Sequence, residues 1–521
     1  MLRALRDRTR PRLRRASPGA ESSGSSCNQP EVFDAAYYFA RRLKVQYLIA
    51  IGISNISRLR NLGRTFQIVA VDSAQRLSEF RAAWDTDTPS DPPPLLGPLF
   101  EDGQAVTNDA EPLLIEHDLE AGLPRIPQAI ASEAIALCSG VLERLKRPQA
   151  LLCDLAGLAR ASPLVLISAM DQPRLNCDTS FDPLDARSTR ISAADKFAQL
   201  LRSCGLETDL VGYTFAAGND PQKGTQLAIA GAHGAPSIPP KLARVLAIMH
   251  VFNERDILIA SVRHLLRQGI DVKVVDNWSS DGSYEEACRL ATTEPRVTVE
   301  RFPPGGPSLY FDLKEIMSNV ERIAAQRTHD WVIHHDTDEF RAAPWPGMTL
   351  QQGISSVDAL GYDAIDFTVV EFKPTQDGFA EGDDPERFFT HFDFGRFRGH
   401  FLQVKAWRSA RSAELVDSAG HHATFPGQRI FPVKFLLKHY PVRSLVQAME
   451  KLFKNRAPRI PPEERGKRFI QYDLRDGAKY LSKPEELRAY DPHTFASEYL
   501  LERTTGVGIL RDSGYATGFA S

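Results

Sequence analysis

Short apolar runs alternate with helical segments along almost the whole chain, and this alternation restricts the possible fold more than any other feature. The runs at residues 47–51, 66–71 and 163–168 have the length of strands. Residues 141–158 and 194–204 space their apolar side chains three and four positions apart, which predicts helices. The alternation predicts an α/β protein with mostly parallel sheets.

One stretch rich in glycine and proline divides this alternation into two parts. The chain of 521 residues is long enough for roughly two to four domains. We expect a disordered basic tail over residues 1–30 and a first Rossmann-like domain over residues 31–232. A linker over residues 233–242 would then lead into a second domain over residues 243–510.

Charge and cysteine content exclude some classes of protein. The net charge of −3 gives no reason to expect a nucleic-acid partner. Six cysteines without a C-x-x-C pair argue against a disulfide framework and fit a reducing compartment. No apolar run approaches the roughly 20 residues that span a bilayer. We therefore expect a cytoplasmic protein without a transmembrane segment, and peripheral association with the inner face of the membrane stays open.

An acidic cluster follows one of the apolar runs in the second part of the chain. Residues 331–333 read as a buried strand, and Asp336 and Asp338 come directly after it. On an extended chain these two carboxylates point the same way, which suits a divalent cation that also binds phosphate oxygens. The same Asp-Thr-Asp tripeptide at residues 85–87 lies among prolines with no strand before it, so the prediction depends on the strand. The cluster predicts a metal–diphosphate site.

The first part of the chain begins with a pattern typical of nucleotide-binding βαβ units. A strand at residues 47–51 runs into Gly52, and the next strand, at residues 66–71, ends in Asp72. A glycine after the first strand and an acid after the second, about 20 residues on, are what such units need to approach and hold a ribose.

Later residues of this part resemble class I S-adenosylmethionine-dependent methyltransferases. Residues 135–145 are similar to that family's fourth strand and following helix, and residues 192–212 to its late helix and strand. The resemblance covers residues 40–230 and implies a doubly wound sheet. It also implies that Gly52 and Asp72 contact S-adenosylmethionine, with Asp72 at the ribose hydroxyls.

The loop after the first strand departs from the family pattern. Residues 50–55 contain one glycine and no leading acid, whereas the family usually has three glycines that allow the backbone to approach the ligand. Two interpretations follow. The first domain either binds S-adenosylmethionine and methylates, or it has lost the cofactor and recognises the acceptor of the second domain.

The second part of the chain carries three motifs, each at the end of a predicted strand. They are residues 252–254, residues 276–283 and residues 336–338. In this order they resemble a family 2-type glycosyltransferase with the GT-A fold, over residues 243–375. Residues 418–421 and 438–444 are similar to the C-terminal half of a bacterial subgroup of these enzymes.

This resemblance implies transfer of a sugar from a nucleotide sugar to a saccharide, lipid-linked or protein acceptor. Departure of the nucleoside diphosphate would need a cation such as Mn²⁺ or Mg²⁺. The implied metal ligands are Asp336, Asp338 and His421. The implied contacts to the nucleotide sugar are Asn253, Glu254, Asp276, Asp336 and Arg443, with Lys438 and His439 as further candidates for the diphosphate.

An acceptor hydroxyl needs a base, and family 2 enzymes generally invert, which implies one carboxylate in that role. Glu371, at the end of a predicted strand, is the first candidate, and Asp383, Asp384 and Asp393 are its competitors. A bifunctional methyltransferase–glycosyltransferase and a non-catalytic binding protein are the alternatives to a glycosyltransferase with an inactive first domain.

Residues after Ser444 predict an amphipathic helix. Leu445, Met449 and Leu452 share one of its faces. The basic residues beside them, Lys451 and Lys454, are expected to be solvated.

Overall fold

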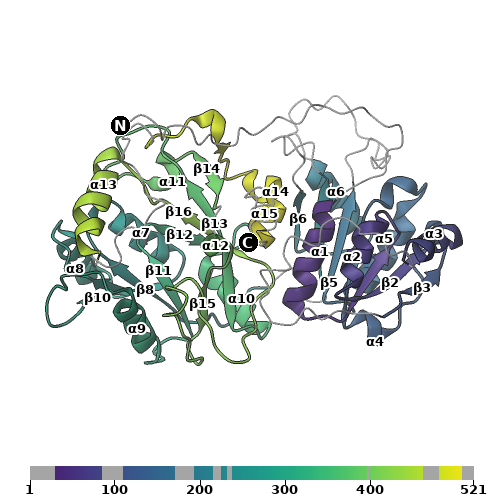
Figure 1. The fold of residues 1–521 in the computed structure, drawn as a ribbon, viewed down its shortest axis with the longest axis horizontal. Coiled ribbons are helices and arrows are strands. Elements are labelled where there is room, and N and C mark those ends of the chain that lie inside the picture. Colours follow the sequence, from purple (N-terminus) through teal and green to yellow (C-terminus); the bar gives the residue numbers. More distant parts are fainter. Residues whose placement is uncertain are drawn as a thin grey trace, which may run out of the picture.

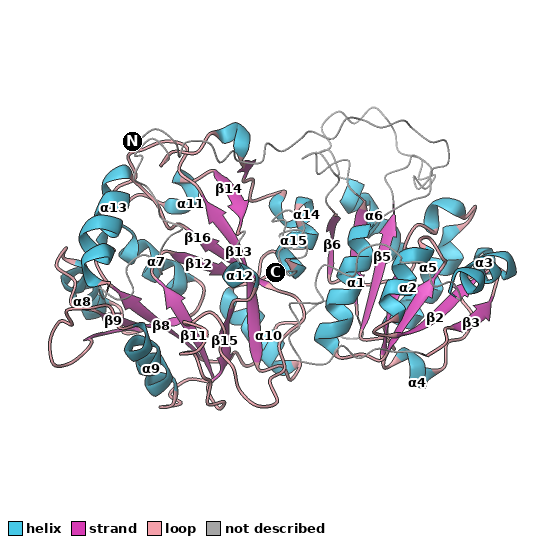
Figure 2. Cartoon of the chain, viewed as in Figure 1, coloured by secondary structure: helices cyan, strands magenta, loops and turns pink. Residues whose placement is uncertain are grey.

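The chain folds as an α/β protein with two mixed, largely parallel sheets, as the alternation predicts (Figures 1 and 2). The computed structural model describes residues 30–84, 110–169, 193–214, 225–231, 237–395, 398–460 and 480–506. The predicted tail before Pro30 and the Asp-Thr-Asp copy at residues 85–87 lie outside them. Residues 237–242, the described part of the predicted linker, contain no helix or strand.

The first sheet has seven strands in the order β3-β2-β1-β4-β5-β7-β6. All neighbours are parallel except β7, which is antiparallel to both β5 and β6. The central strands are apolar and buried along their length, as parallel strands covered by helices on both faces must be. The strands are β1 Tyr47–Ile51, β2 Gln67–Asp72, β3 Leu113–Glu116, β4 Ala134–Cys138, β5 Leu164–Ala169, β6 Leu210–Tyr213 and β7 Gln226–Ala230.

The helices of this first unit agree with the predicted periodicity with one correction. The helix expected over residues 141–158 is shorter in the structure. Leu142–Arg144 form a 3₁₀ turn, and α5 begins only at Pro148. Proline suits the first turn of a helix and keeps the residue before it out of the helical region. The helices are α1 Pro30–Leu43, α2 Ile56–Gly63, α3 Ala74–Trp84, α4 Gln128–Ala131, α5 Pro148–Ala159 and α6 Ala193–Ser203.

The second sheet has the order β10-β9-β8-β11-β15-β13-β14-β17, and β16 pairs with both β12 and β13. The first four strands are parallel, and β15 runs antiparallel to β11 and β13. The strands are β8 Val245–Val251, β9 Asp271–Asp276, β10 Val297–Arg301, β11 Trp331–Asp336, β12 Glu339–Ala342, β13 Ala364–Phe372, β14 His391–Phe394, β15 Val404–Arg408, β16 Phe435–His439 and β17 Arg488–Ala489. The helices are α7 Arg255–Arg267, α8 Ser283–Thr293, α9 Leu313–Ala324, α10 Leu350–Ala359, α11 Pro385–Phe388, α12 Arg398–Phe401, α13 Leu445–Met449, α14 Phe495–Glu498 and α15 Leu500–Thr505.

The two units share an interface formed by elements from both ends of the described chain. Helices α14 and α15 pack against β6, and α1 contacts α15 between the two sheets (Figure 1). Gly212 in β6 has no room for a side chain, because a Cβ atom there would collide with the Ser497 carbonyl. Arg42 of α1 forms an ion pair of 2.8 Å with the buried Asp366 of β13. One apolar core cluster runs through both units, so they pack as one body of side chains.

Candidate functional site

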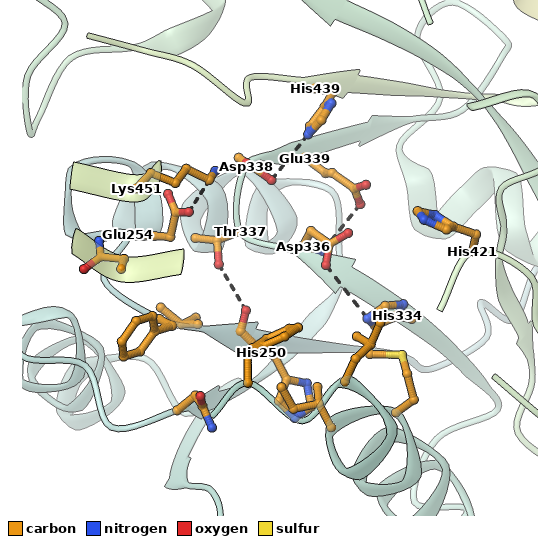
Figure 3. A pocket seen from close by; sticks show the side chains of 18 of the residues that line it. His250, Glu254, His334, Asp336, Thr337, Asp338, Glu339, His421, His439 and Lys451 are labelled. Carbon is orange, nitrogen blue, oxygen red and sulfur yellow. Dashed lines mark hydrogen bonds and ion pairs between the residues drawn. The ribbon is translucent and has the colours of Figure 1, made fainter. Parts of the chain in front are cut away.

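A cavity of about 540 Å³ opens where β8 and β11 end side by side (Figure 3). Carboxyl ends of parallel strands are where open α/β sheets place their ligands. The cavity is unusually rich in charged and imidazole side chains. Those that line it are His250, Glu254, His334, Asp336, Asp338, Glu339, His400, His421, His439, Lys451 and Arg459.

The acidic cluster sits on the connection between β11 and β12. Strand β11 ends at Asp336, a two-residue turn holds Thr337 and Asp338, and β12 starts at Glu339. The chain is therefore turned here rather than extended, so the premise that an extended backbone aligns Asp336 with Asp338 does not apply. The backbone N–H of Tyr440 donates to the Asp338 carbonyl over 2.8 Å and fixes the turn against the chain after β16.

Asp336 has a lysine, Lys405, on one oxygen. A histidine, His334, faces its other oxygen (Figure 3). The buried ammonium of Lys405 lies 2.6 Å from Asp336 Oδ2 and 2.9 Å from Glu339 Oε1. His334 Nε2 lies 3.9 Å from Asp336 Oδ1. Burial alone would raise the pKa of Asp336, but the Lys405 charge outweighs it and holds that pKa well below its usual range.

Asp338 repeats this arrangement with different partners. Lys451 Nζ lies 2.8 Å from its Oδ2, while His439 Nε2 lies 3.7 Å from its Oδ1. Arg443 Nη1 stands behind the same carboxylate at 3.9 Å. Burial acts to raise the pKa of Asp338, and the cations, Lys451 first, lower it far more, so the group is ionised.

The hydrogen bonds of His334 fix which of its nitrogens is free. Its Nδ1 lies 3.0 Å from the Gly420 carbonyl, which can only accept, so Nδ1 carries the proton and Nε2 has a lone pair. Burial lowers the pKa of His334 to about 4, so the ring is neutral near pH 7. Two acceptors, His334 Nε2 and Asp336 Oδ1, therefore face each other with no proton between them.

Each aspartate and the histidine that faces it could give two ligands to a divalent cation. At each aspartate, an oxygen and an imidazole nitrogen lie 3.7–3.9 Å apart, too far for a hydrogen bond. A cation with metal–ligand distances of about 2.0–2.2 Å could bridge either gap. A ring N–H donated to a backbone carbonyl, as in His334, is the usual support of a metal-binding histidine. Within the described ranges, no three His, Cys, Asp or Glu side chains lie together closely enough to hold a metal ion.

His421, the predicted third metal ligand, lines the cavity with its Nδ1 3.0 Å from the amide nitrogen of Gln403. Burial lowers the pKa of His421 to about 4. The histidines that face oxygens of the two aspartates are instead His334, 3.9 Å from Asp336, and His439, 3.7 Å from Asp338. The role of His421 as a ligand stays a prediction.

Asn253 and Asp276 lie just behind the cavity wall. Asn253 adopts a left-handed backbone with φ of 54°, and its amide nitrogen donates to Asn455 Oδ1 over 2.9 Å. Asp276 is fully buried; its Oδ2 accepts from the Ser279 N–H, and its Oδ1 has no hydrogen-bond partner among the described residues. Burial raises the pKa of Asp276. A buried acceptor without a donor is what a site for a ligand N–H needs.

Two other predicted residues, Arg443 and Glu371, do not line the cavity. Arg443 is fully buried, forks onto Asp256 at 2.7 and 2.8 Å, and also bonds Glu254. It does not line the cavity, so its predicted contact with the diphosphate has no geometry to support it. Glu371 lies inside β13, bonded to Lys373 and 3.9 Å from His400 Nδ1. It is likewise not a lining residue, although His400 is.

The competing base candidates have ordinary structural partners. Asp383 accepts from the Ala380 N–H in an exposed turn, and Asp384 caps α11. Asp393 pairs with Arg488 at 2.5 Å. The identity of the base stays a prediction.

The sequence analysis did not predict that Lys405 and Lys451 are the partners of the two aspartates. Lys451 was expected to be solvated but is buried, because Asp338 and Glu254 neutralise its charge. Lys454, three residues on, is exposed as expected. Lys405 gave no signal in the sequence, since its acidic partners come from a strand connection about 70 residues earlier.

In the first unit, the predicted S-adenosylmethionine contacts Gly52 and Asp72 are engaged with protein groups, and their role in cofactor binding stays a prediction. Gly52 has φ of 75°, and the place a side chain would take is filled by Val141, with Arg144 next to it. Asp72 accepts hydrogen bonds from the Ile53 and Ser73 N–H groups, over 2.7 and 2.8 Å. Both residues serve packing and loop geometry, so we derive no methylation step from them.

We therefore expect no saturable binding of S-adenosylmethionine to the full chain at concentrations up to about 1 mM. A dissociation constant of about 1 mM corresponds to a binding free energy of about −4 kcal/mol, so any interaction would be weaker than that. Isothermal calorimetry with S-adenosylmethionine and S-adenosylhomocysteine measures this directly. Binding in the micromolar range, lost in Asp72→Ala, would restore the methyltransferase interpretation.

The fold is that of an α/β protein with two mixed, largely parallel sheets, and the site lies at strand ends of the second sheet. No protein-family model and no curated protein sequence matches the chain. Among solved structures, it is similar to the mannosyltransferase PcManGT from Pyrobaculum calidifontis, in complex with GDP-Man and Mn²⁺: identity 14%, coverage 55% of this chain and 78% of that chain, TM-score 0.24.

Two further solved structures match the chain at a similar level. The S-adenosylmethionine-dependent methyltransferase SibL, in its apo form, is 14% identical over 40% of this chain and 55% of its own, with a TM-score of 0.22. The N-terminal domain of EvdMO1 with bound SAH is 15% identical over 39% of this chain and 81% of its own, with a TM-score of 0.23. The chain thus spans about half of SibL. These similarities concern the fold, and the functional argument depends on the cavity.

Among the helices that the structure describes, none has the length and apolar character needed to cross a membrane.

Proposed function

We propose that the chain is a glycosyltransferase that moves a sugar from a nucleoside diphosphate sugar to a saccharide, lipid-linked or protein acceptor. One observation carries the proposal. At the carboxyl ends of parallel strands, Asp336 and Asp338 each give one oxygen to a lysine and keep the other opposite a histidine nitrogen. The oxygens that face the histidines would be available to a divalent cation, and the lysines would attract an anionic ligand such as a diphosphate.

The chemistry needs positive charge where the diphosphate leaves. A bound Mn²⁺ or Mg²⁺ would supply charge to the diphosphate oxygens. Asp336, Asp338, His334 and His439 would hold the cation. The ammonium group of Lys451 lies 2.8 Å from Asp338 and lines the same cavity, so it would add a second positive charge near the diphosphate.

The donor nucleoside is proposed to lie toward the end of β9. The unpaired Oδ1 of Asp276 supports this position, because a base or ribose can donate a hydrogen bond to it. The first unit is proposed to contribute to acceptor recognition. The alternative, a bifunctional methyltransferase–glycosyltransferase, is decided by the S-adenosylmethionine titration described above.

The proposal predicts that one nucleoside diphosphate binds the wild-type chain in a Mn²⁺-dependent manner. Calorimetric titrations with UDP, GDP and dTDP, and with CMP for contrast, would identify the base. Removing the metal with EDTA is expected to weaken binding at least tenfold, which corresponds to about 1.4 kcal/mol. If none of the three diphosphates binds in the presence of Mn²⁺, the proposed function is wrong.

A further inference from the structure

One short segment contributes three polar side chains to the cavity wall. Residues 450–460, called the strap below, follow α13 as a π-helix, Glu450–Arg456, and a 3₁₀ turn, Ala457–Arg459. Lys451, Asn455 and Arg459 all line the cavity, and their spacing of four residues places them on one side of the segment. A π-helix is rare, and it occurs frequently at functional sites.

Lys451 at the start of the strap is buried between two acids. Its Nζ lies 2.8 Å from Asp338 Oδ2 and 2.9 Å from Glu254 Oε1. A buried ammonium is stable only with such partners. The same ammonium is therefore at hand for an anion that enters beside Asp338, and a diphosphate can replace one of the two carboxylates as its partner.

Arg459 at the end of the strap occupies a different part of the cavity. Its guanidinium carbon lies 4.1 Å from the centre of the Phe252 ring, and its Nη2 donates to Asn277 Oδ1 over 2.6 Å. Its Nη1 is buried and has no hydrogen-bond partner among the described residues. Asp276, next to Asn277, has an unpaired acceptor as well. An aromatic face, a spare donor and a spare acceptor match the face, carbonyl and N–H of a nucleobase.

Few apolar contacts hold the outward face of α13 and the strap, so a ligand could change the position of the strap. Val446 and Met449 of α13 and Phe453 of the strap are 68%, 42% and 46% exposed. Met449 belongs to the apolar face of the amphipathic helix predicted from the sequence, and in the structure it is exposed. The strap is instead held by polar contacts with the site, among them Asn455 with Asn253, so their replacement by a ligand acts directly on it.

We propose that the strap recognises the two halves of the donor nucleotide separately, with Lys451 binding the diphosphate and Arg459 the nucleoside. This rests on the proposed function. In the structure, each of these residues is held by protein groups at the position where the corresponding half of a nucleotide would bind. Nucleotide binding then closes the strap from both ends.

The test compares the diphosphate and monophosphate of the base that the wild type binds, in Lys451→Met, Arg459→Met and the control Lys454→Met. Lys451→Met is expected to lower diphosphate affinity at least tenfold and monophosphate affinity much less, so the ratio of the two affinities falls. Arg459→Met is expected to weaken both nucleotides equally and keep the ratio. Lys454 points outward and pairs with Glu450, so Lys454→Met should match the wild type. An unchanged ratio in Lys451→Met would overturn the proposal.

Hydrogen exchange of the wild type gives a readout that needs no variant. Saturating nucleoside diphosphate is expected to slow amide exchange across residues 450–460 at least tenfold, with less effect from the monophosphate. Equal exchange with and without bound nucleotide would contradict closure of the strap while leaving the proposed function intact. A wild type that binds no nucleotide would instead remove the proposed function itself.

Discussion

Asp338→Asn is expected to abolish Mn²⁺-dependent binding of the nucleoside diphosphate. Asp338 offers Oδ1 opposite His439 Nε2 at 3.7 Å and uses Oδ2 to hold Lys451 at 2.8 Å. A neutral amide is a poor ligand for a hard cation and a weaker partner for the ammonium. Loss of this ligand should exceed the roughly 10–100-fold effect of losing an outer-shell partner. Calorimetric titration with Mn²⁺ and the diphosphate measures the change.

The chain contains its own control for this substitution. Asp87→Asn alters the corresponding position of the second Asp-Thr-Asp tripeptide and should leave binding unchanged. Asp338→Asn must also stay folded, since Lys451 keeps Glu254 as a partner, and a urea unfolding curve checks this. If a folded Asp338→Asn protein retains Mn²⁺-dependent binding, Asp338 is not a metal ligand.

The sequence allowed the fold to be predicted well where local periodicity decides the structure. The strands around residues 47–51 and 331–333 form as expected, because runs this short that are rich in β-branched and aromatic residues favour buried strands over helices. The predicted helix over residues 141–158 was wrong over residues 141–147, because Pro148 sets the start of α5. The effect of Pro148 on the residues before it outweighs the helical spacing of apolar residues over 141–158 there.

The sequence predicted only those residues of the candidate site that directly follow a predicted strand. Asp336, Asp338 and Glu254 were expected at one edge, and all three line the cavity. Their cationic partners were not, because Lys405 and Lys451 approach from distant segments, 69 and 113 residues away from Asp336 and Asp338 respectively. The burial of Lys451 differs from the predicted solvated position, because partners from distant parts of the chain neutralise its charge and periodicity does not reveal them.

Asp366→Asn is expected to lower the free energy of unfolding of the whole chain by about 3–5 kcal/mol, the usual cost of breaking a buried ion pair. Asp366 is fully buried, pairs with Arg42 at 2.8 Å and bonds Lys434, and its Oδ1 accepts from the Gln403 N–H. Asparagine keeps the shape but leaves two buried cations without their anion. Urea unfolding measures the change.

The pH dependence of this deficit separates charge from packing. Burial acts to raise the pKa of Asp366, but Lys434 and Arg42 lower it, so its contribution is present above the ordinary aspartate range and is lost on acidification. Burial lowers the pKa of Lys434 to about 8 even with Asp366 present. Above that pH Lys434 sheds its proton in the native state, so the deficit of Asp366→Asn should shrink between pH 7 and pH 9.

Glu79→Gln provides the matched control, because the Arg76–Glu79 pair is on the surface and should contribute about 0–1 kcal/mol at most. A deficit in Asp366→Asn that stays below 1 kcal/mol, or that does not change between pH 7 and pH 9, would contradict the ion-pair account. Arg42 belongs to the helix before the first sheet, and Asp366 and Lys434 belong to the second unit. Because the pair and the shared apolar core both join the two units, the wild type should unfold in one transition, and Asp366→Asn is the substitution expected to split it.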